Sequence, residues 1–111
     1  MVRIITDTTS CLRPDFASTH HIPVIPQVVN FGNDSYLEGI GMDAQTFLKR
    51  LKTSAELPKT AAPPIELFIK EFERLVPLGE PILCIYNMPP AIVTHTGPGV
   101  LGVGFFLPQS A

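Results

Sequence analysis

Charged residues are scarce in this chain. They make up 16% of its 111 residues, against roughly 25% in an average domain, while hydrophobic residues make up 45%. So little charge indicates either a surface that is covered by something else or an apolar binding site. The net charge of the chain is −2. Nucleic-acid-binding proteins usually carry a basic stripe and membrane-surface proteins a polybasic patch, so we expect no nucleic-acid partner.

Cysteines and long apolar runs are also few. Cys11 and Cys84 are far apart in the sequence, which fits neither a disulfide framework nor a zinc site and suits a reducing compartment. The longest apolar stretch, residues 97–107, is far short of the ~20 residues that span a bilayer. Asp7 interrupts the N-terminus before an apolar signal-peptide core could form. We therefore expect a cytoplasmic protein with no transmembrane segment.

The apolar pattern predicts strands that alternate with helices. We predict strands over residues 2–6, 24–31 and 82–86. We predict helices over residues 14–20 and 65–76, and a third that begins after an Asp43 N-cap. Because alternation of this kind is typical of βαβ units, the expected fold is α/β with a parallel sheet. From residue 91 onward the chain holds no charged residue and is expected to form a short β-type C-terminal segment with strands at 91–94 and 100–107.

Few residues suggest chemistry by their pattern alone. Gly97, Gly99 and Gly102 match the spacing of a dinucleotide fingerprint, but a β-type run follows them and no acid lies about 20 residues on, so we reject it. The turn from Asp7 to Ser10 lies at the end of the first strand, where open α/β sheets bind ligands. Hydroxyl capping of that turn explains the residues equally well. His95 could donate to a carboxylate, although a loop histidine bonded to a nearby carbonyl is the simpler interpretation.

Five segments, in order, resemble motifs of the DegV family. The first is Ile-Ile-Thr-Asp-Thr-Thr-Ser at residues 4–10, and the second is Val-Ile-Pro-Gln-Val-Val-Asn-Phe-Gly at 24–32. Tyr-Leu-Glu-Gly at 36–39, Leu-Pro-Lys-Thr at 57–60 and His-Thr-Gly-Pro-Gly at 95–99 complete the set. Each match alone is modest, whereas five in the correct order are specific.

The resemblance implies a non-enzymatic α/β protein without a cofactor or metal that binds a long-chain fatty acid between two domains. The resemblance also implies a partner, a fatty-acid kinase that phosphorylates the bound carboxylate. By resemblance, Thr60 would bind that carboxylate and His95 would assist. The further candidates to line the pocket are Asp7, Thr8, Asn30, Phe31, Thr96 and Gly97. The resemblance divides the chain into a DegV-like N-terminal domain at residues 1–88 and a remnant of the C-terminal segment at 89–111.

The sequence departs from the family pattern after the strand at 82–86. Family members continue there into a Ser-Ser-x-x-Ser-Gly-Thr motif, whereas this chain continues Asn-Met-Pro-Pro at 87–90. The middle of the family pattern is missing, and we expect a true internal deletion. Two alternatives to fatty-acid binding stay open: a small enzyme that uses the turn from Asp7 to Ser10 for phosphate or acyl chemistry, and a truncated product without a ligand. An exposed sheet edge in such a chain would favour a homo-oligomer.

Overall fold

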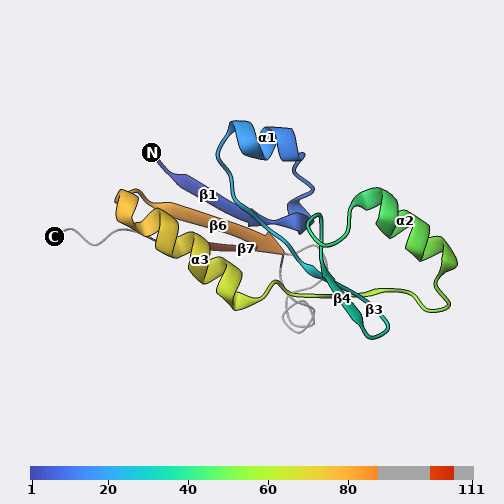
Figure 1. Cartoon of the computed structure of the whole chain (residues 1–111). Coiled ribbons are helices and arrows are strands. Elements are labelled where there is room, and N and C mark those ends of the chain that lie inside the picture. The colour runs from blue at the N-terminus through green and yellow to red at the C-terminus, as the bar shows by residue number, and fades with distance from the viewer. Residues whose placement is uncertain (88–100, 107–111) are drawn as a thin grey trace. The chain divides into compact units, whose positions relative to one another are not determined.

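The computed structural model describes residues 1–87 and 101–106 (Figure 1). Its contacts divide the chain into two compact units. Unit 1 comprises Met1–Ile25 and Ile65–Ala111, and unit 2 comprises Pro26–Pro64. The boundary expected at residue 88 is a different division, and it stays a prediction.

Unit 1 is built on a four-stranded sheet in the order β2-β1-β6-β7. The strands are β1 (Arg3–Asp7), β2 (Val24–Ile25), β6 (Ile82–Asn87) and β7 (Leu101–Phe106). β1 runs parallel to both β2 and β6, which confirms the expected parallel sheet and α/β class. The strand expected at 100–107 is confirmed as β7, and it runs antiparallel to β6.

The helices of unit 1 form where the sequence predicts them. α1 (Pro14–Thr19) has proline in its first turn, where the missing N–H costs no hydrogen bond. α3 (Ile65–Leu75) packs its apolar face on the sheet and ends in a short 3₁₀ turn, Val76–Leu78. Leu75 lies in a core with Ile5 and Ile82. Phe68 and Phe72 of α3 cover that core.

Unit 2 is a three-stranded antiparallel sheet with one helix. The strands are β3 (Val28–Phe31), β4 (Asp34–Leu37) and β5 (Lys59–Ala61), in the order β4-β3-β5. α2 (Ala44–Thr53) begins at the expected N-cap, where the Asp43 carboxylate accepts a hydrogen bond from the Thr46 amide at 2.7 Å. Gly32 takes a φ of 58° in the two-residue loop between β3 and β4, a geometry that favours glycine.

One prediction about this region is wrong. The single strand expected over residues 24–31 is two strands in two different sheets, β2 beside β1 and β3 between β4 and β5. The break falls at Pro26, whose lack of an N–H makes it unsuited to a continuous strand. The proline-rich connection at 57–64 contains the short strand β5, which pairs with β3. The strand expected at 91–94 lies outside the described residues, as does the join from 88 to 91.

A search of the described residues finds no helix that is both long enough and apolar enough to cross a membrane.

Candidate functional site

Thr60 lies on an edge strand of the unit 2 sheet. β5 pairs on one side with β3, in a register that places Thr60 opposite Val29. Residues directly opposite each other in an antiparallel pair share a face of the sheet, so Thr60 lies on the same face as Val29. Val29 is buried, whereas Thr60 is exposed. Pairing with β3 therefore holds the Thr60 hydroxyl at an accessible margin of the sheet.

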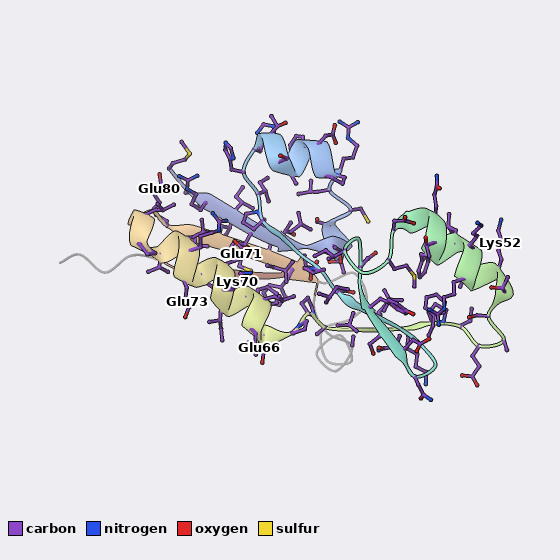
Figure 2. The ribbon with its side chains drawn as sticks, in the orientation of Figure 1. Lys52, Glu66, Lys70, Glu71, Glu73 and Glu80 are labelled. Atoms are coloured by element: carbon purple, nitrogen blue, oxygen red, sulfur yellow. The ribbon has the colours of Figure 1, made fainter. Side chains whose placement is uncertain are left out.

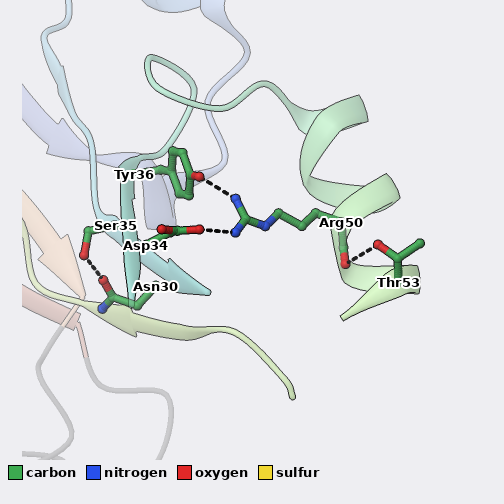
Figure 3. Close-up of polar contacts among 6 residues, drawn as sticks. All are labelled: Asn30, Asp34, Ser35, Tyr36, Arg50 and Thr53. Carbon is green, nitrogen blue, oxygen red and sulfur yellow. Dashed lines mark hydrogen bonds and ion pairs between the residues drawn. The ribbon is translucent and has the colours of Figure 1, made fainter. Parts of the chain in front are cut away.

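The two other candidates in unit 2 occupy different environments. Phe31 is 5% exposed and belongs to the core of the unit with Val29 and Met42. Its ring meets the Phe47 ring edge-on, at 5.7 Å between centroids. Asn30 lies on the opposite face, half-buried, and its Oδ1 accepts a hydrogen bond from the Ser35 hydroxyl at 2.6 Å (Figure 3). Asn30 is thus the candidate that offers polar atoms, while Phe31 contributes packing.

Arg50 of α2 fastens the helix to the β3–β4 hairpin (Figure 3). Its guanidinium donates to the Tyr36 hydroxyl and to the Asp34 carboxylate. It also lies over the Phe31 ring, 4.9 Å from the centroid, and over the Tyr36 ring at 5.1 Å. The hydrogen bonds that Arg50 donates to Asp34 and then to Tyr36 raise the pKa of Arg50. No sequence pattern indicates this cluster, because its members meet only when α2 folds back on the hairpin.

The turn from Asp7 to Ser10 in unit 1 is bonded within itself. Asp7 is 2% exposed and caps the 3₁₀ turn Thr8–Ser10. Its Oδ1 accepts from the Thr9 amide at 2.9 Å and from the Thr9 hydroxyl. The Ser10 hydroxyl donates to the Asp7 carbonyl oxygen at 2.9 Å. These bonds match the capping interpretation of the turn.

Cys84 of β6 lies near the same carboxylate. Burial raises the pKa of the Cys84 thiol, and the negative charge of Asp7 raises it further. A raised pKa keeps the thiol protonated, so it lacks the thiolate character that a nucleophilic cysteine requires. Cys84 therefore serves in the core with Ile5 and Ile82.

The predicted site residues fall into three groups. Thr60, Asn30 and Phe31 share the sheet of unit 2. Asp7 and Thr8 belong to unit 1. His95, Thr96 and Gly97 lie outside the described residues. No cluster of three or more His, Cys, Asp or Glu residues that could hold a metal ion occurs in the part of the chain that the structure describes.

The sequence and the fold are both similar to those of known proteins. Residues 1–86 match a family model described as an uncharacterised protein of the DegV family. A DegV domain-containing protein of Halalkalibacterium halodurans is 36% identical over 78 residues, which are 70% of this chain and 28% of that protein. The crystal structure of DegV, a fatty acid binding protein from Bacillus subtilis, matches with a TM-score of 0.69 and 29% identity, over 77% of this chain and 30% of that one.

A stearic acid-binding protein from Eubacterium ventriosum is similar to the same degree. Its crystal structure matches with a TM-score of 0.69 and 27% identity, over 76% of this chain and 29% of that chain. The chain thus spans less than a third of the length of these relatives.

Proposed function

Because this chain belongs to the DegV family, we propose that it binds a long-chain fatty acid and holds the carboxylate through Thr60. The observation that carries the proposal is the similarity of its fold to two structures described as fatty-acid-binding proteins, at 27% and 29% identity. Since the chain spans less than a third of their length, the activity of the longer relatives is part of the proposal. The low content of charged residues also supports an apolar ligand.

The placement of Thr60 supports its role. Within the described part of the chain, the Thr60 hydroxyl has no hydrogen-bond partner, and its strand is fixed by β3. A hydroxyl held in this way can donate to a carboxylate oxygen without first breaking another bond. His95 is the second donor that we propose, because a histidine can assist a carboxylate from either ring nitrogen.

Titration of the chain with hexadecanoate tests the role of Thr60. A hydrogen bond to a charged group contributes about 1.5–3 kcal/mol, and an exposed site falls at the lower end of that range. Thr60→Val should therefore weaken binding by about tenfold while leaving the far-UV circular dichroism unchanged. Thr60→Ser, which keeps the hydroxyl, should bind nearly as well as the wild type. Equal affinities for the wild type and Thr60→Val would remove Thr60 from the site.

The cellular role that we propose is that of a carrier. In this role the chain is cytoplasmic, catalyses nothing itself and presents the acyl carboxylate to a fatty-acid kinase. Association into a homo-oligomer is part of the same proposal, since a chain with so little charge benefits from covering apolar surface. Assay of the purified chain with and without a fatty-acid kinase, ATP and hexadecanoate tests it: acyl phosphate should form only when the kinase is present.

A further inference from the structure

The unit 2 sheet has a second face, turned away from α2. Val29, Phe31 and Tyr36 lie on the face that packs with Phe47 of α2. Because side chains alternate along a strand and cross-strand partners share a face, the registers of β3 with β4 and with β5 define the residues of the other face. Those residues are Val28, Asn30, Ser35, Leu37, Lys59 and Ala61.

Two parallel rows make up this face. A polar row crosses the sheet through Ser35, Asn30 and Lys59, which are direct partners in the strand register. An apolar row crosses it through Leu37, Val28 and Ala61. Residues two apart in a strand are separated by roughly 7 Å, and three strands span roughly 10 Å. The second face is therefore amphipathic. Its polar and apolar rows are spaced on the scale of a carboxylate headgroup and a section of an acyl chain.

Lys59 is the one charged residue among the strand residues of this face, and it is exposed. The nearest acid along β4, Asp34, pairs with Phe31 in the register and binds Arg50 on the face of α2. Asn30 accepts a hydrogen bond from Ser35 through Oδ1, which leaves its Nδ2 group as a donor beside Lys59. A positive charge and an amide donor thus lie together next to an apolar row.

We propose that Lys59 and Asn30 select the carboxylate of the fatty acid, and that the acyl chain contacts the apolar row of Leu37, Val28 and Ala61. This inference rests on the proposed function and adds the residues that distinguish an acid from an uncharged amphiphile. The carboxylate lies at the free margin of β5, where Lys59 reaches it from one face of the sheet and Thr60 from the other. A long lysine side chain suits this position, because its apolar stem can follow the sheet while its ammonium group stays in water.

A comparison of hexadecanoate with hexadecanol tests the proposal. Each would displace a fluorescent fatty acid from the full chain, and the ratio of their affinities measures carboxylate selection. The wild type should bind the acid more tightly. Because exposed charge pairs are weak, Lys59→Met should reduce that ratio by about two- to fivefold, through weaker binding of the acid. The alcohol should bind as before.

Matched variants separate this role from general effects of charge. Lys59→Arg keeps the charge and should retain most of the ratio. Lys52→Met removes an exposed lysine of α2 in the same unit (Figure 2) and should leave the ratio unchanged. An unaltered ratio in Lys59→Met, with Thr60→Val still weakened, would overturn the role of Lys59 and leave the proposed function intact. A wild type that binds neither ligand would overturn both.

Discussion

The polar residues that follow β1 in unit 1 bond to one another, whereas those of β5 in unit 2 remain partly open. At the end of β1, the Asp7 carboxylate and the hydroxyls of Thr9 and Ser10 close a turn among themselves. In unit 2, Lys59 and Thr60 lie exposed on an edge strand. The hydroxyls of Thr9 and Ser10 thus already have local partners, whereas β5 presents side chains that a ligand can reach.

Two arginines of unit 1 differ from Lys59 of unit 2 in the same way. On α3 of unit 1, Arg74 donates twice to Glu71, at 2.7 and 2.9 Å, and Arg3 of β1 pairs with Glu80. These cations already have carboxylate partners from their own unit. Lys59 has none among the described residues. A ligand carboxylate would therefore meet less competition at Lys59 than at Arg74 or Arg3.

The largest loss of stability is expected when a side chain of the unit 1 core is truncated. Ile82 is 1% exposed, between Ile5 and Leu75, so Ile82→Ala should lower the free energy of unfolding by about 2–5 kcal/mol. Ile65→Ala is the matched control, because Ile65 is 67% exposed and the change should stay within about 1 kcal/mol. Urea denaturation gives both values, and equal losses in the two variants would contradict the assigned core.

A smaller effect is expected from the cluster that fastens α2 in unit 2. Arg50→Met removes the hydrogen bonds to Asp34 and Tyr36, and we expect a loss of stability that is a fraction of that in Ile82→Ala. A double-mutant cycle with Asp34→Asn isolates the ion pair. Its coupling energy should fall as salt is added, because exposed charges are screened. Zero coupling at low salt would show that the pair does not hold the helix.

The buried thiol of unit 1 predicts a dependence of stability on pH. Burial, and then Asp7, raise the pKa of Cys84, so the folded state keeps its proton at a pH where the unfolded thiol, with a pKa of about 8.5, has lost it. The stabilisation is complete below the unfolded pKa and is lost as the pH rises toward the folded pKa. The free energy of unfolding should fall more steeply above pH ~8.5 in the wild type than in Cys84→Ala. Identical slopes would contradict the shift.

The N-cap of α2 should give the smallest change in stability. Its dependence on pH should run in the opposite direction to that of Cys84. Hydrogen bonds from Thr46 lower the pKa of Asp43, so its stabilising contribution is present above the unfolded pKa of about 3.9 and is lost as the pH falls through the lower folded value. Asp43→Ala should remove this acid dependence, whereas Asp43→Asn should keep part of the cap at every pH. Thermal unfolding across the acid range distinguishes the three proteins.

The sequence predicts unit 1 better than unit 2, for physical reasons. The helices near Pro14 and Ile65 and the strands near Ile5 and Ile82 carry local signals, in the form of caps and apolar periodicity. β4 and β5 carry weak local signals, since Asp34 and Lys59 are not typical strand residues. They become strands because β3 offers hydrogen bonds on both sides. The pairing of β5 with β3 joins residues about 30 positions apart in the sequence, such as Asn30 and Lys59, which periodicity cannot reveal.

The residues of the candidate site also differ in how well the sequence predicts them. The resemblance to a family points to Thr60 and Asn30, whereas composition and spacing alone do not. Neither source revealed that Lys59 shares a face with Asn30, because that relation depends on the strand register. Phe31 was expected to line a pocket, and the structure places it in the core of unit 2, so its role at the ligand stays a prediction.

Native mass spectrometry of the purified chain after incubation with hexadecanoate tests the central claim most directly. We expect a protein species heavier by the mass of one fatty acid, which is depleted in Thr60→Val and retained in Thr60→Ser. A wild-type spectrum that shows the bare chain alone, under conditions where a known fatty-acid-binding protein retains its ligand, would contradict the account.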